Sequence, residues 1–145
     1  IKSLGYKVDL IVSGYGELKE EIFPDLNLIN LNGASNFKTI LFLANYLRNI
    51  KVPKYAVWAM MKNKEPDLFI RQFKGIFKKI ITIPIENEQN CMSSKDLKSI
   101  CKRNQFNVDE ANSINDAIKK ISSPEKKLIN CIGSLYNVGN ILNKN

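Results

Sequence analysis

The sequence contains no histidine, and this absence removes several kinds of catalytic site at once. Histidine is the commonest general base, so Ser-His and Cys-His nucleophile pairs are excluded. Cys91, Cys101 and Cys131 are too few for an all-cysteine zinc site, and without histidine no mixed site can form. Their odd number and wide spacing favour reduced thiols over a disulfide framework. We therefore expect a cytoplasmic protein with no zinc centre.

The sequence also lacks the loops that grip phosphate in nucleotide-binding proteins. No G-x-x-x-x-G-K-[ST] loop occurs, and the Gly-x-Gly in SGYGEL (13–18) has no third glycine at the spacing of a dinucleotide fingerprint. No acid pair or magnesium-binding carboxylate cluster is evident either, so we assign no catalytic and no metal-binding residue. A complete enzyme is hard to find in this chain.

Long apolar runs are missing as well. None reaches the ~18 residues that a membrane span requires, and the start of the chain does not read as a signal peptide. We therefore expect no membrane association. Because the first residue is Ile1, we expect a fragment of a longer protein or the product of a split gene.

Arginine is scarce although the net charge is +8. Such a charge invites a nucleic-acid interpretation. However, arginine, the side chain favoured for specific phosphate and base contacts, occurs only at Arg48, Arg71 and Arg103. The lysines are scattered among Asn and Ile, which indicates a solvated surface. A basic binding module for nucleic acid is the weakest of the alternatives that we keep open.

What the sequence does contain is an alternation of buried-strand and amphipathic-helix patterns within 145 residues, enough for one domain. Expected strands cover 8–12, 26–31, 55–60, 79–85 and 127–133, with a weaker one at 106–111. Expected helices cover 36–50, 66–77, 93–104, 112–121 and 135–144. Continuous apolar runs between helices predict a single α/β domain over 1–145, with a mostly parallel sheet of five or six strands and helices on both faces. Trp58, Cys101 and Cys131 are expected in the core. The connection over 84–94 is polar, and we expect it to be mobile.

Three strand ends carry polar or glycine residues. They are NGASN (32–36), MMKNKE (60–65) and GSLYNVG (133–139). Ligands of open parallel sheets bind beyond the carboxyl ends of the strands, and the helix that follows a glycine turn offers free N–H groups to an anion. We expect the nucleotide- or substrate-facing residues at these ends. They are Asn32, Gly33, Ser35, Asn36, Lys64, Ser134 and Tyr136.

Together with the connection PIENEQNCMSSKDL (84–97), these motifs resemble, in the same order, the C-terminal domain of the folylpolyglutamate synthase / dihydrofolate synthase family. This family belongs to the Mur-ligase-like amide ligases. Its members read Asp-Gly-Ala-His-Asn-Pro at the first strand end, Val-Phe-Gly-Met-Leu then Asp-Lys-Asp at the second, and Cys-Gly-Ser-Leu-Tyr with Val-Gly at the last. The resemblance covers about residues 1–143.

The resemblance implies a Rossmann-like domain that closes over ATP and glutamate in an ATP-dependent ligase acting on folates or dihydropteroate. ATP and magnesium would be held mainly by an N-terminal ATP-binding domain or chain, which is absent here. The implied partners are that domain, the folate or dihydropteroate, and glutamate. The fragment alone should be inactive.

The sequence departs from the family at the first strand end. The family's Asp, His and Pro are Asn32, Ser35 and Phe37 here, and its upstream nucleotide-contacting Arg has no counterpart in 1–25. The last strand end matches best, from Gly133 to Tyr136. Two interpretations therefore stay open beside the basic module: a working ligase domain, and a degenerate remnant that folds without catalysing.

Overall fold

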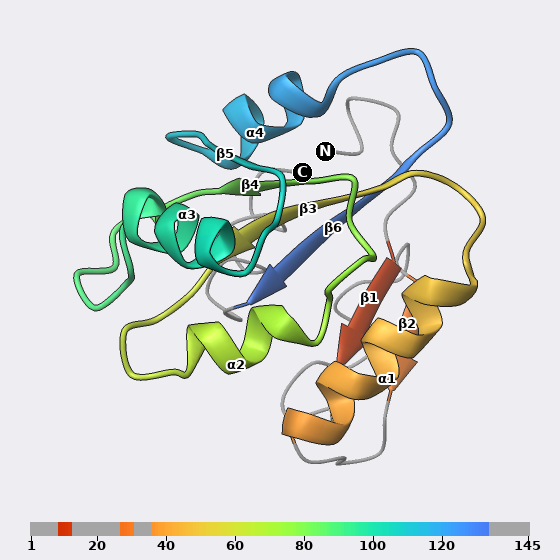
Figure 1. Ribbon diagram of the computed structural model, residues 1–145, viewed down its shortest axis with the longest axis horizontal. Coiled ribbons are helices and arrows are strands. Elements are labelled where there is room, and N and C mark those ends of the chain that lie inside the picture. Colours follow the sequence, from red (N-terminus) through yellow and green to blue (C-terminus); the bar gives the residue numbers. More distant parts are fainter. Residues whose placement is uncertain (1–8, 13–26, 31–35, 134–145) are drawn as a thin grey trace.

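The computed structural model describes residues 9–12, 27–30 and 36–133 of the chain (Figure 1). Two kinds of element alternate along it, as the sequence predicts. The strands are β1 (Asp9–Val12), β2 (Asn27–Asn30), β3 (Lys54–Ala59), β4 (Lys79–Thr82), β5 (Val108–Glu110) and β6 (Leu128–Gly133). The helices are α1 (Asn36–Asn49), α2 (Pro66–Arg71), α3 (Ser94–Arg103) and α4 (Ile114–Ile121).

Four of the strands form an entirely parallel sheet in the order β5-β4-β3-β6. Strand β3 lies in its interior, and Val57 and Trp58 on it are completely buried. A strand between two neighbours and under helices on both faces has no surface for polar residues, which explains the continuous apolar run at this position.

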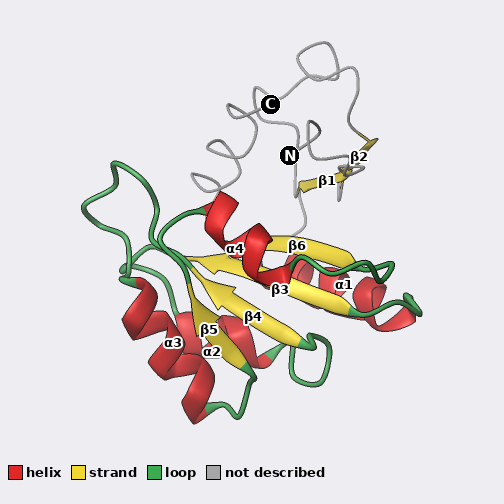
Figure 2. Ribbon diagram, turned by 90° about the horizontal axis from the view of Figure 1, so that it is seen from above, coloured by secondary structure: helices red, strands yellow, loops and turns green. Residues whose placement is uncertain are grey.

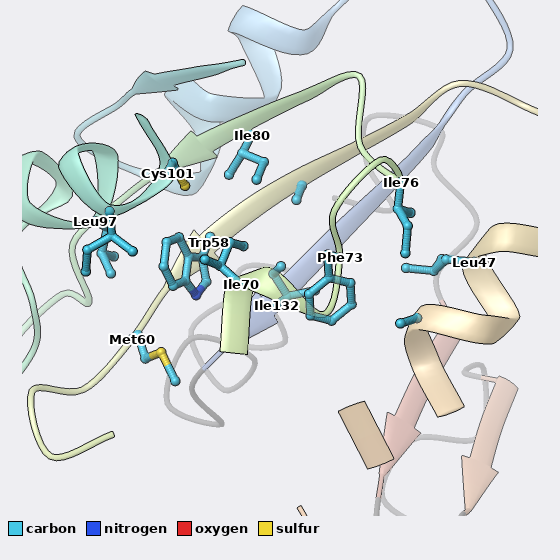
Figure 3. Close-up of a cluster of buried hydrophobic side chains, with 13 residues drawn as sticks. Leu47, Trp58, Met60, Ile70, Phe73, Ile76, Ile80, Leu97, Cys101 and Ile132 are labelled. Carbon is cyan, nitrogen blue, oxygen red and sulfur yellow. The ribbon is translucent and has the colours of Figure 1, made fainter. Parts of the chain in front are cut away.

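Helices cover both faces of this sheet, as Figure 2 shows from above. Helices α1, α2 and α3 pack on one face, where Leu47, Ile70 and Leu97 belong with Trp58 to the larger core (Figure 3). Helix α4 alone covers the other face among the described helices, and Ile118 packs there against Val57. The predicted three-layer α/β architecture is confirmed.

The main sheet has fewer strands than the predicted five or six. Strands β1 and β2 pair in parallel with each other, in register from Asp9–Asn27 to Val12–Asn30, and form a separate two-stranded sheet. The run at 26–31 was expected inside the main sheet, and the structure corrects that placement. An apolar run predicts a strand but not its neighbour, because pairing depends on hydrogen bonds to a distant segment.

Helix boundaries differ most at the predicted helix 66–77, since α2 ends at Arg71. The chain continues through tight i→i+3 turns such as Ile76 N–H to the Phe73 carbonyl (3.0 Å). Gly75 then adopts φ +76°, a left-handed conformation that ends helical winding. Helices α3 and α4 begin one and two residues inside their predicted starts, because Ser93 and Ser113 serve as N-caps.

Two predicted core residues are buried as expected. Trp58 and Cys101 have no exposed surface, and burial raises the pKa of the Cys101 thiol to about 12. Cys131, the third predicted core residue, is only partly buried, packed against the second core, and burial raises its pKa to about 11. All three cysteines are free thiols. Within the described ranges, no helix is long and apolar enough to cross a membrane. The expected helix over 135–144 lies outside the described residues.

Candidate functional site

The sheet has a topological switch point between β3 and β6. From β3 the chain moves outward through β4 to β5, and it then returns to place β6 on the other side of β3. All four strands are parallel, so their carboxyl ends lie at one edge. Ligands of open α/β sheets bind at this edge beside the switch point. The segments that leave β3 and β6 carry two of the three predicted ligand-facing motifs.

The end of β6 approaches the end of β3 unusually closely at Gly133. This residue pairs with Ala59 and has φ +111°. A Cβ atom built on Gly133 would lie 1.9 Å from the Ala59 carbonyl oxygen and 3.1 Å from Cδ1 of Trp58. Only glycine fits this backbone conformation and this contact. The motif that matches the family best therefore begins at a position with a strict geometric requirement.

The corner that follows β3 is held by the connection that follows β4. Met61 pairs with Cys91 in an isolated antiparallel bridge. Two backbone bonds flank the pair: the Lys62 N–H donates to the Asn90 carbonyl (2.8 Å), and the Met92 N–H donates to the Met60 carbonyl (2.8 Å). The connection over 84–94, expected to be polar and mobile, thus has a hydrogen-bonded part that alternation patterns do not signal.

Lys64 is the predicted site residue that the structure describes best. It is exposed in the bend after this bridge, and its N–H donates to the Met61 carbonyl (3.3 Å). Lys62 is exposed beside it, and its ammonium group donates to the Gln89 carbonyl (3.4 Å). The corner therefore presents two ammonium groups at the carboxyl edge, which suits a phosphate or a carboxylate.

The other predicted site residues are described less fully. Asn36 is the first residue of α1, and nothing further is described of its side chain. Asn32, Gly33, Ser35, Ser134 and Tyr136 lie outside the described residues. Their assignment remains a prediction from the sequence.

Within the part of the chain that the structure describes, one buried polar group near the switch point has no hydrogen-bond partner. It is the indole N–H of Trp58, which is stacked on Phe69 with ring centroids 6.1 Å apart. Figure 3 shows Trp58 between Leu97 and Ile132. Sequence reasoning placed this residue in the core correctly, but nothing in the sequence signals an unsatisfied N–H.

A cluster of charges that the sequence did not reveal lies at the opposite border of the sheet. The Asp109 carboxylate on β5 lies 3.6 Å from the ammonium groups of Lys79, Lys98 and Lys120. Its pKa is lowered, chiefly because the Glu110 N–H donates to it (2.8 Å). Burial opposes this shift, and the three lysines add to it. The lysines come from a strand and two helices, so only the folded chain brings them together.

A depression of about 480 Å³ lies next to this cluster, lined by the end of β5, by α4 and by the first residue of α3. Its lining includes Ser94, Glu110, Asp116 and Lys120. Lys120 already donates to the Glu110 carbonyl (2.6 Å). Because two acidic and two basic side chains line the depression, it favours neither sign of charge and is a weaker candidate site than the β3–β6 edge. Among the described residues, no group of three or more metal-ligating side chains converges anywhere.

Comparison with known proteins agrees with the fold. No protein-family model and no curated protein matches the sequence. Solved structures do match. The Escherichia coli FolC protein in complex with DHPP and ADP is 17% identical, with a TM-score of 0.62, covering 77% of this chain and 27% of its own. Folylpolyglutamate synthase from Thermotoga maritima is 24% identical, with a TM-score of 0.58, covering 78% and 26%.

Folylpolyglutamate synthase from Mycobacterium tuberculosis, complexed with ADP and AMPPCP, is 15% identical, with a TM-score of 0.65, covering 77% of this chain and 28% of its own. At these identities the likeness shows the fold. The resemblance that the sequence motifs indicated is therefore confirmed at that level: the chain has a fold found in folylpolyglutamate synthases. It spans about a quarter of the length of the structures it matches.

Proposed function

We propose that the chain is the C-terminal domain of a folate-type, ATP-dependent glutamate ligase, and that it closes over ATP and glutamate held mainly by a separate ATP-binding domain. One observation carries the proposal. Motifs that resemble the family in their order follow β3 and β6, adjacent strands of a sheet whose fold matches folylpolyglutamate synthase structures. Fold likeness by itself does not define a reaction, so the motifs at the sheet edge are essential to the argument.

The described residues suit a contributing role in such a ligase. Lys62 and Lys64 supply positive charge where the strands end, appropriate for a phosphate or a carboxylate. We assign the nucleotide- or substrate-facing role to Lys64 and, from the sequence, to Asn32, Gly33, Ser35, Asn36, Ser134 and Tyr136. Magnesium would be held by the other domain. With its three free thiols, we place the ligase in the cytoplasm.

The proposed partners are the ATP-binding ligase domain, a folate or dihydropteroate, and glutamate. FolC has been captured with DHPP and ADP, and a Yersinia pestis bifunctional relative with AMPPNP and Mn ion. These complexes motivate the choice of substrates for testing this chain.

The test is reconstitution. The full chain is mixed with, or fused behind, the ATP-binding domain of E. coli FolC, and transfer of labelled glutamate to dihydropteroate and to tetrahydrofolate is measured with ATP. We expect ligation that depends on the chain and falls about tenfold or more in Lys64→Met, because charge-assisted contacts contribute ~1.5–3 kcal/mol. Lys51→Met is the matched control, since Lys51 is exposed and precedes β3, at the end of the strand opposite to Lys64. A folded chain that supports no ligation would favour the degenerate remnant.

A further inference from the structure

The bridge between the ends of β3 and β4 has a geometry that fixes the Lys62–Lys64 corner. Met61 and Cys91 are a non-hydrogen-bonded antiparallel pair, flanked by the Lys62–Asn90 and Met92–Met60 backbone bonds. In such pairs the Cα atoms lie about 4.5 Å apart and the side chains contact each other. The bridge is not part of the hydrogen-bond ladder of the parallel sheet. It lies beyond the carboxyl end of β3, at the edge where ligands of such sheets bind.

Both segments of the bridge are anchored in the cores. Met60 is buried in the larger core and Met92 packs against it, whereas Met61 and Cys91 pack against the second core. The segment 86–92 is thereby fixed at one end by Met92 and at the other by Ile85, which is 4% exposed. An exposed loop that is tied to two cores keeps its position more firmly than one held only at its ends.

The segment also has internal structure that suits a rigid role. Asn87 adopts φ +60°, and the Asn90 N–H donates to the Glu88 carboxylate (3.0 Å). The Cys91 N–H donates to the Glu88 carbonyl (3.3 Å). These turns direct the chain back toward β3, so that the Asn90 and Gln89 carbonyls accept from the backbone and side chain of Lys62.

We propose that the segment Glu86–Met92 is a strap that positions the corner after β3, so that Lys64 meets its anionic substrate group at a fixed place. This inference rests on the proposed function and adds positioning residues to that site. Misplacing a contact residue by about 1 Å can reduce catalysis about a hundredfold. Backbone hydrogen bonds that hold the corner beside Lys64 can therefore affect activity.

A matched pair of variants tests the first backbone bond, between the Lys62 N–H and the Asn90 carbonyl. Lys62→Pro removes the N–H that donates to Asn90, and Lys62→Ala removes the same ammonium group but keeps the N–H. Lys62 is exposed, so neither change opens the core. Met92→Pro and Met92→Ala test the second backbone bond, from the Met92 N–H to the Met60 carbonyl, in the same way. Agreement between the two positions would show that the effect is not specific to residue 62.

The first measurement is hydrogen exchange on the full chain alone. We expect Lys62→Pro, and not Lys62→Ala, to lower protection of the Met92 amide, with little change for amides in β3. Equal protection of the Met92 amide in the two variants would show that the strap does not hold the corner after β3. This result would stand whether or not the chain is a ligase domain.

The second measurement is a double-mutant cycle in the reconstituted ligase. Lys62→Pro should raise KM for ATP or for glutamate about tenfold relative to Lys62→Ala, and should have no further effect in the Lys64→Met background. Additive losses in the two backgrounds would indicate a merely structural role and overturn the positioning claim. An active wild type with equal kinetics for Lys62→Pro and Lys62→Ala overturns the strap alone; a wild type that never ligates overturns the ligase function and the strap's role with it.

Discussion

At the scale of single residues, Gly133 shows how a sequence match acquires a physical meaning. The motif GSLYNVG marks it as one of several positions that resemble the folylpolyglutamate synthase family. The structure adds the reason: φ +111° and a hypothetical Cβ 1.9 Å from the Ala59 carbonyl oxygen. Gly75 also has positive φ, but no atom lies within 4 Å of its hypothetical Cβ. A side chain at Gly133 would meet both backbone strain and a steric clash, whereas a side chain at Gly75 would meet only the strain.

We predict that Gly133→Ala destabilises the fold by roughly 3 kcal/mol or more, because strain and a backbone clash act together. Gly75→Ala, the control, should cost about 1–2 kcal/mol, since only the left-handed conformation is penalised. Urea unfolding followed by Trp58 fluorescence measures both. Equal effects of the two substitutions would show that β6 can move away from Ala59 at little cost.

A second residue-scale prediction concerns Asn32, where the family resemblance implies an aspartate. A charged acceptor forms stronger hydrogen bonds than a neutral one, ~1.5–3 against ~1 kcal/mol. Asn32→Asp should therefore tighten binding of a non-hydrolysable ATP analogue about tenfold in the reconstituted pair, measured by calorimetric titration. Asn112→Asp adds the same charge at an exposed position after β5 and should leave affinity unchanged. Unchanged affinity in Asn32→Asp would indicate that position 32 no longer faces the nucleotide.

At the scale of elements, β5 illustrates how a short edge strand is protected. It has three residues and pairs only with β4 among the described strands. Lys98 from α3 and Lys120 from α4 both reach Asp109 on it, and Lys98 also contacts Glu110 (3.3 Å). Charges along an edge discourage pairing with other chains, and here they also join helices from the two faces of the sheet.

The lowered pKa of Asp109 predicts a particular pH dependence. A carboxylate whose pKa in the folded chain is below its ordinary value of 3.8 stabilises the fold above that value, and this stabilisation disappears as pH falls through the folded-state pKa. Asp109→Asn should thus lower the free energy of unfolding at pH 7 by about 1 kcal/mol, typical of partly exposed ion pairs.

The difference between wild type and Asp109→Asn should shrink as pH falls below about 4, near the ordinary carboxyl pKa. Urea unfolding at several pH values, in low salt, tests this. A difference that stays constant down to pH 2 would mean that ionisation of Asp109 contributes nothing to stability. Added salt should reduce the difference at neutral pH, since partly exposed charges are screened.

At the scale of the whole molecule, the chain supplies a sheet edge with positive charge and backbone geometry suited to a ligand, but no phosphate-gripping loop is present in its sequence. The matched region spans about a quarter of the length of those ligase structures. If the proposed function holds, activity should require a second domain.

We accordingly predict that the purified chain by itself neither hydrolyses ATP nor ligates glutamate. Phosphate release and incorporation of labelled glutamate are measured with dihydropteroate and with tetrahydrofolate, and the reconstituted pair serves as the positive control. Turnover of ATP by the chain alone that falls in Lys64→Met would contradict the assignment of the missing machinery to another domain.

The sequence alone determined the elements and their class, because burial on both faces requires the continuous apolar runs of β3, β4 and β6 and an amphipathic face on each covering helix. It also indicated the family through motifs at strand ends. Tertiary structure decided what depends on segments distant in the chain: β2 pairing with β1 outside the main sheet, the bridge between Met61 and Cys91, and the three lysines around Asp109. Periodicity records which face of an element is buried, whereas pairing and charge contacts arise between elements, so no local pattern encodes them.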